Sequence, residues 1–220
     1  MRDLRELIEK DGRESLLPFL DAYIKITEGV IDEKSKGHFE EPDKLTELDI
    51  RFAELYLDAM KAYLEGGEKK QPWKTYLDYI ERDNSKPVVE LLLGINAHIN
   101  SDLTQVLWEQ EYDNLNDFKQ INLVLRRSLY PVMVKIGVER HDVELFTLMG
   151  ALPMSWTGLK RVQSWRSYSL KNSKKPNFNL EEIRELTEKN AKNIIELRHE
   201  HHPLRMIRKP FKAMKTGVKI

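Results

Sequence analysis

Residues 90–103 read ELLLGINAHINSDL, and this stretch decides how the whole chain is interpreted. Its first half has the composition of a protein interior. Its second half carries four side chains that form hydrogen bonds: Asn96, His98, Asn100 and Asp102. Because the residues before them are apolar nearly all round a helix, we predict a buried central helix over about residues 87–109.

The four polar residues form two pairs, each spaced by one helical turn. His98 and Asp102 lie on one stripe, with Gly94 one turn before them, and Asn96 and Asn100 lie on roughly the opposite side. A buried polar group without a partner costs on the order of 1–3 kcal/mol. Both pairs therefore need partners from elsewhere in the fold.

Two interpretations of these pairs are open. In the first they form a structural network, in which Asp102 accepts a hydrogen bond from His98 and the asparagines bridge to neighbouring backbone. In the second they form a site, in which His98 and Asp102 offer a nitrogen and a carboxylate to one divalent cation. Gly94 would then leave room for a substrate or a water molecule. Spacing alone favours the structural network, because most buried polar groups are simply hydrogen-bonded.

Helical periodicity continues on both sides of this stretch, and no strand-like alternation of useful length occurs. We therefore predict an all-α protein built as a single helical bundle. Along the chain it divides into N-terminal helices that pack on the core (1–36), a helical core with the central motif (37–171), a C-terminal helix (177–202) and a basic tail (203–220).

Proline and glycine mark the expected helix limits. Pro18 is expected to break or kink a helix over residues 13–29. The polar segment 31–43 is typical of a loop, and Gly66-Gly67 should end the helix that follows it. Asn179, followed by two glutamates, is the expected N-cap of the C-terminal helix.

The charge and cysteine content exclude several classes of function. The chain has 36 Lys and Arg against 36 Asp and Glu, so no overall field favours nucleic acid as a partner. With no cysteine, disulfides, thiolate zinc sites and cysteine nucleophiles are excluded, and any metal ion would need His, Asp or Glu ligands. No apolar run is long enough to form a transmembrane segment. We expect a soluble, cytoplasmic protein.

The central motif also carries a resemblance to a known family. Leu92 to Leu103 is similar to the L-L-x-G-M-N-A-H-I-N-x-D-L hallmark of an uncharacterised, mostly bacterial domain-of-unknown-function family. Shorter matches to the same family follow in chain order: His38-Phe39 with Pro42, Asp49-x-Arg51-Phe52, Pro72-Trp73, Asp117-Phe118 with Asn122, and Arg161 with Trp165. The resemblance covers about residues 37–170 and implies a shared helical fold and a shared polar centre, but no reaction.

These signals give the candidate site residues. His38, in the predicted loop, is a tentative third metal ligand beside His98 and Asp102, and Arg51 is suited to a carboxylate or phosphate. A solvated surface is the alternative for both. The candidate catalytic residues are His98, Asp102, Asn100 and Arg51. The candidate ligand-binding residues are His38, Asn96, Asp49 and Trp73.

Three functions compete on this basis. The first is a metal-assisted hydrolase or a related small-molecule enzyme that uses a divalent metal ion. The second is a pocket that binds a polar small-molecule ligand without a metal ion. The third is a helical interaction module whose polar centre is only structural. The basic tail after Pro203 suits an acidic partner or an anionic surface. The dipeptide His141-Asp142 lacks the later aspartate that a metal phosphohydrolase motif requires.

Overall fold

A computed structural model describes residues 1–139 and 152–198 of the chain. Within these ranges the protein is helical and contains no strand, which confirms the all-α prediction. The elements outside the central stretch are α1 (Arg2–Lys10), a short 3₁₀ turn η1 (Glu14–Leu16), α2 (Leu17–Ser35), α3 (Pro42–Leu64), α4 (Lys74–Ile80), α7 (Leu115–Glu139), α9 (Leu152–Ser173) and α10 (Leu180–Arg198).

The sequence predicted one regular α-helix over the central stretch, but the structure divides this stretch into three elements. It consists of α5 (Pro87–Ala97), a π-helical turn η2 (His98–Asp102) and α6 (Leu103–Glu109). At the end of η2 the backbone N–H of Leu103 bonds to the carbonyl of His98, five residues earlier. Such turns are rare and insert one extra residue into a helix, often at functional sites. The polar motif coincides with this turn.

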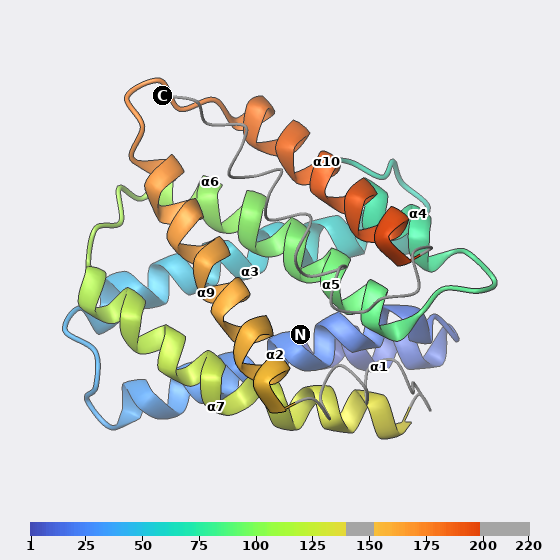
Figure 1. The fold of residues 1–220 in the computed structure, drawn as a ribbon, viewed down its shortest axis with the longest axis horizontal. Helices are drawn as coiled ribbons and strands as arrows, with labels where there is room; N and C mark the ends of the chain where they lie inside the picture. The colour runs from blue at the N-terminus through green and yellow to red at the C-terminus, as the bar shows by residue number, and fades with distance from the viewer. Residues whose placement is uncertain (140–151, 199–220) are drawn as a thin grey trace.

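Other helices surround the central stretch. Helices α2, α4 and α10 pack against α5, whereas α3 and α9 pack against η2 and α6 (Figure 1). Between residues 87 and 107 every residue is buried except Leu92, Ile95 and Gln105. The buried apolar side chains form two clusters, one mainly from α1, α2, α4 and α5 and the other mainly from α3, α6, α7 and α9.

Two helix limits differ from the prediction because of proline. Pro18 does not break a helix but lies in the first turn of α2, where its missing N–H has no intrahelical partner to lose. Pro42 begins α3 in the same way. Since α2 continues to Ser35, the loop predicted over residues 31–43 is reduced to residues 36–41.

Other predicted limits hold. The backbone of Gly66 has φ of +75° just after α3, a left-handed conformation that glycine adopts without strain. Asn179 Oδ1 accepts the backbone N–H groups of Glu181 and Glu182 and so caps α10. The His141-Asp142 dipeptide and the basic tail lie outside the described residues.

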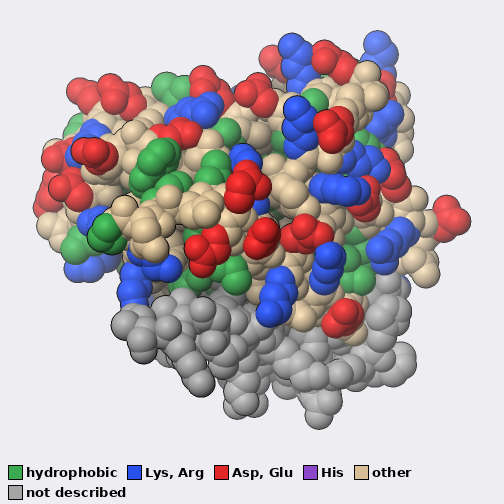
Figure 2. All heavy atoms as spheres, turned by 90° about the horizontal axis from the view of Figure 1, so that it is seen from above, with side chains coloured by type: hydrophobic (Ala, Val, Ile, Leu, Met, Phe, Trp, Pro, Cys, Tyr) green, Lys and Arg blue, Asp and Glu red, His purple; other side chains and the backbone are tan. Residues whose placement is uncertain are grey.

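Acidic and basic side chains are interspersed over the face drawn in Figure 2, in keeping with the balanced composition. None of the helices in the described ranges combines the length and the apolar composition needed to cross a bilayer.

Gly94 provides space for a side chain of the core, not for a ligand as the sequence had suggested. A Cβ atom built on Gly94 would lie 2.5 Å from Cγ of Phe19 and 2.8 Å from its Cβ. Real Cβ atoms do not approach so closely. The absence of a side chain at position 94 therefore lets α2 bring Phe19 against α5, and the ring of Phe19 reaches the imidazole of His98 at a centroid distance of 5.5 Å.

We expect Gly94→Ala to lower the free energy of unfolding by about 1–2 kcal/mol. Overpacking against Phe19 costs about 1–3 kcal/mol, and the better helix propensity of alanine offsets up to about 1 kcal/mol of it. Urea unfolding measures the loss. In a double-mutant cycle with Phe19→Ala, which removes Cγ and Cδ2 and leaves only Cβ near position 94, most of the clash should be relieved, so the two losses should sum to more than the loss in the double variant. Additive losses would contradict this account.

Candidate functional site

Asp102 is the centre of the polar network in η2. Its Oδ2 accepts a hydrogen bond from Nε1 of Trp73 at 3.0 Å and lies 3.3 Å from Nδ1 of His98. All three side chains are buried. Burial raises the pKa of Asp102 well above its usual value and lowers the pKa of His98 well below its own. Both shifts favour the neutral forms of the two side chains.

Aromatic rings enclose His98. Its imidazole stacks on Phe52 with a centroid distance of 3.6 Å and an interplanar angle of 10°. Tyr23 meets it edge-on at 4.4 Å, and Phe19 closes another side. With the proton on Nδ1, His98 donates to Asp102 and its Nε2 is left as an acceptor. That Nε2 atom is buried and has no hydrogen-bond partner among the described residues.

The asparagine pair connects the same turn to α10. Nδ2 of Asn100 donates to Oδ1 of Asn96 at 2.9 Å, and Nδ2 of Asn96 donates to the backbone carbonyl of Thr187 at 2.9 Å. These hydrogen bonds connect the central stretch to α10. The geometry on this side of η2 is that of the structural network.

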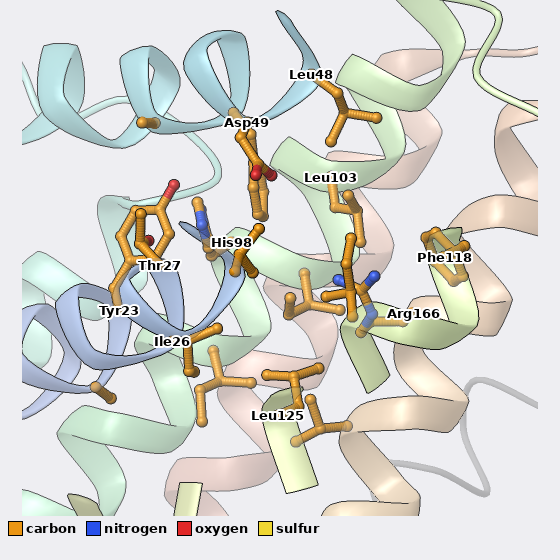
Figure 3. Close-up of a pocket in the computed structure, with 18 of the residues that line it drawn as sticks. Tyr23, Ile26, Thr27, Leu48, Asp49, His98, Leu103, Phe118, Leu125 and Arg166 are labelled. Carbon is orange, nitrogen blue, oxygen red and sulfur yellow. The ribbon is translucent and has the colours of Figure 1, made fainter. Parts of the chain in front are cut away.

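A cavity lies on the other side of η2, between α2, α3, α6, α7 and α9. Its volume is about 90 Å³, and most of its wall is aliphatic or aromatic. The side chains in its wall that carry polar groups are Tyr23, Thr27, Asp49, His98, Tyr112 and Arg166. Figure 3 shows Tyr23 of α2, Asp49 of α3 and Arg166 of α9 converging on one space beside His98.

Arg166 is a buried cation in the wall of this cavity, with 4 % of its surface exposed. Its Nε donates to Oδ1 of Asn122 at 3.0 Å, and its guanidinium lies 4.3 Å from the ring centroid of Phe118. Its Nη2 is buried and has no hydrogen-bond partner among the described residues. Burial lowers the pKa of Arg166 to about 10, which still leaves it protonated at pH 7.

Asp49 faces Arg166 across the cavity. Burial raises the pKa of the Asp49 carboxyl to about 6, and the positive charges of Arg166 and Lys34 only partly oppose this shift. No hydrogen bond or ion pair joins Asp49 to Arg166, although both side chains are described. Two opposite charges therefore line one apolar cavity without neutralising each other by direct contact.

Two of the candidate residues lie elsewhere. His38 is exposed, and its Nδ1 contacts Oε2 of Glu33 at 2.8 Å. Arg51 pairs with Glu109 at 3.0 Å on the surface between α3 and α6. Neither contacts the His98–Asp102 pair, because each side chain pairs with a glutamate elsewhere. Within residues 1–139 and 152–198, no three His, Asp or Glu side chains are grouped as ligands of one metal ion.

Arg166 is the residue of this site that sequence reasoning missed. The resemblance drew attention to Arg161 and Trp165, whereas Arg166 lies on a stripe with Val162 and Ser169, all three of which are buried. An arginine between such neighbours at positions i−4 and i+3 was a signal of burial. The spacing of residues along the chain did not predict that Asp49 would lie across the cavity from Arg166.

Comparison with known proteins identifies the family but not an activity. The sequence profile of a family of unknown function, DUF5995, matches residues 1–201. The chain belongs to this family. The match includes the two N-terminal helices, which the motif resemblance had left outside. Neither the comparison with curated proteins nor the comparison with solved structures gave a significant match.

We expect Asp102→Asn to change the free energy of unfolding by less than about 1 kcal/mol at pH 7, and Asp102→Leu to lower it by about 2–4 kcal/mol. Asparagine keeps a carbonyl oxygen for Trp73 and His98, whereas leucine leaves both buried donors unpaired at about 1–3 kcal/mol each. Chemical denaturation measures both changes. If asparagine proves as damaging as leucine, the network needs the carboxylate charge, which contradicts a neutral Asp102.

His98 should make stability depend on pH below about 6.5. Its folded-state pKa is lowered, so the unfolded chain binds the proton more readily, and the stability that His98 contributes above pH 6.5 is lost as pH falls toward the folded pKa. Between pH 6 and 5, unfolding free energies should fall by about 1.4 kcal/mol per pH unit more in the wild type than in His98→Asn. Parallel pH profiles would contradict this prediction.

Proposed function

We propose that the protein binds a small molecule in the cavity between α2, α3, α6, α7 and α9. One observation carries this proposal: the wall of an apolar cavity holds a buried arginine whose Nη2 has no hydrogen-bond partner in the part of the chain that the structure describes. Ligand sites are typically apolar hollows with a few convergent polar groups, some with shifted pKa values. Asp49, His98 and Arg166 are such groups.

Energetics support a ligand site over an accident of packing. A cavity of about 90 Å³ costs about 2 kcal/mol relative to a filled core, at about 24 cal/mol per Å³. An unpaired donor on a buried charged group adds on the order of 1–3 kcal/mol. Replacing Arg166 by an apolar side chain of similar volume would remove the second cost. The presence of both the cavity and the unpaired donor of Arg166, despite their cost in stability, supports a role for them in binding.

The other two functions have weaker support. A metal-assisted hydrolase rests on the His98–Asp102 pair alone, because His38 and Arg51 pair with other side chains and, among the described residues, no third His, Asp or Glu is grouped with this pair. An interaction module accounts for the asparagine pair and its link to α10. It does not account for a cation and a carboxyl group in the wall of a cavity.

The test is a binding measurement with three small probes of similar size: propionate, propionamide and 1-propanol. We expect at least one of them to shift the NMR resonances of residues in the cavity wall, and Ala53→Leu to abolish the shifts. Ala53 lines the cavity from α3, so three added carbon atoms fill part of it. The matched control is Ala62→Leu, nine residues further along the same helix and outside the cavity wall.

Both variants must keep the wild-type circular dichroism spectrum, which separates loss of the cavity from loss of the fold. If no probe binds the wild type while Ala53→Leu raises the melting temperature, the cavity is a packing defect and the proposal fails. If the probes still bind to Ala53→Leu, they bind outside the cavity, and the proposal is also wrong.

A further inference from the structure

Resting on the proposed function, we propose that the natural occupant of the cavity is a short-chain carboxylate. Its carboxylate group would bind the guanidinium of Arg166, and binding would place a proton from solvent on Asp49. The ligand class and this proton uptake follow from three features of the cavity. These are the orientation of the Arg166 guanidinium, the position of Asp49 and the volume that remains for an apolar tail.

The guanidinium of Arg166 is preorganised for a planar anion. Asn122 holds its Nε, the ring of Phe118 supports one face of the guanidinium, and Nη2 is left without a partner in the described ranges. A carboxylate accepts two parallel hydrogen bonds from such a fork and supplies the counter-charge that a buried cation needs. A neutral amide or alcohol satisfies the donor but leaves the charge uncompensated.

Asp49 determines the protonation state of the complex. The carboxyl lines the same cavity, so a bound carboxylate would place two negative charges close together in a medium of low polarity. Protonation of Asp49 removes that repulsion and gives the ligand a second hydrogen-bond donor. The free protein is already close to this state, because burial raises the pKa of Asp49 to about 6.

The groups around Asp49 leave no other acceptor of that proton. The titratable or charged side chains that face it are Tyr23 and Lys34 of α2, His98 of η2, Tyr112 after α6 and Arg166 of α9. From α7 the cavity receives only the apolar side chains of Phe118, Ile121 and Leu125. Burial lowers the pKa of His98, so its imidazole remains neutral when Asp49 takes up the proton.

The volume limits the length of the tail. A cavity of 150 Å³ holds benzene, or about 25 Å³ per non-hydrogen atom. The cavity here, at about 90 Å³, therefore holds about four such atoms before side chains move. We expect a small shift of Leu125 to extend this to a propionate or butyrate. Longer acids must displace the aromatic side chains that enclose His98, so affinity is expected to fall beyond butyrate.

The experiment is an NMR titration of the full chain with propionate and propionamide at pH 6, 7 and 8. If Asp49 has a pKa of about 6 in the free protein and remains protonated in the complex, the propionate Kd rises about 50-fold from pH 6 to pH 8. The propionamide Kd changes less than twofold, because no charge enters the cavity.

Three variants identify the groups responsible. Asp49→Asn should make the propionate Kd independent of pH, whereas Asp58→Asn, an exposed carboxylate on the same helix, should behave as the wild type. Arg166→Lys should weaken propionate at least tenfold, since lysine lacks the fork, and should leave propionamide within threefold. Propionamide thus reports whether each variant retains a folded cavity.

The outcomes separate this inference from the proposed function. If propionamide or propanol binds and propionate does not, the cavity is a ligand site but not one for a carboxylate. If alanine binds more tightly than propionate with no pH dependence, the site takes a zwitterion whose ammonium pairs with ionised Asp49, and this inference is wrong. If no probe binds, both proposals fail.

Discussion

The interior of this protein depends on the need to satisfy one carboxyl group, that of Asp102. A carboxyl in the middle of a helical bundle is tolerated only where hydrogen-bond donors meet it. Trp73, just before α4, and His98, in η2, supply those donors. Their contacts connect the start of α4 to the central helical stretch and determine the orientation of the His98 ring. The rings of Phe19, Tyr23 and Phe52 then pack against this oriented imidazole, so the apolar core and the polar centre stabilise each other.

The π-helical turn gives the central stretch two sides with different roles. On one side Asn96 and Asn100 bond to each other and to the backbone of α10, so their hydrogen bonds hold two helices together. On the other side the imidazole of His98 lines a cavity whose charged groups are not paired with each other. The same turn of five residues therefore has a structural network on one side and a candidate ligand site on the other.

The cavity lies where the two apolar clusters meet, and its charges come from helices that are distant in the chain. Asp49 is on α3 and Arg166 on α9, and both helices pack on α6. An occupant held by both side chains would therefore connect two helices through the ligand. A molecule that binds only the native state raises apparent stability, and here it would also compensate a buried charge that the protein alone leaves unpaired.

Much of this arrangement was readable from the sequence, because helix formation and one-turn spacing are local properties. The periodicity of residues 87–109 and the prolines and glycines at helix ends indicated an all-α chain, and the i,i+4 spacing predicted the His98–Asp102 and Asn96–Asn100 contacts. Local reasoning failed where a contact joins distant segments of the chain. It predicted His38 and Arg51 near the polar centre, and it predicted room for a ligand beside Gly94, where Phe19 packs. It also missed Arg166. Spacing within a helix determines which side chains share a face. Only the packing of one helix on another determines what that face meets, and so only the tertiary structure placed Asp49 and Arg166 in the wall of one cavity.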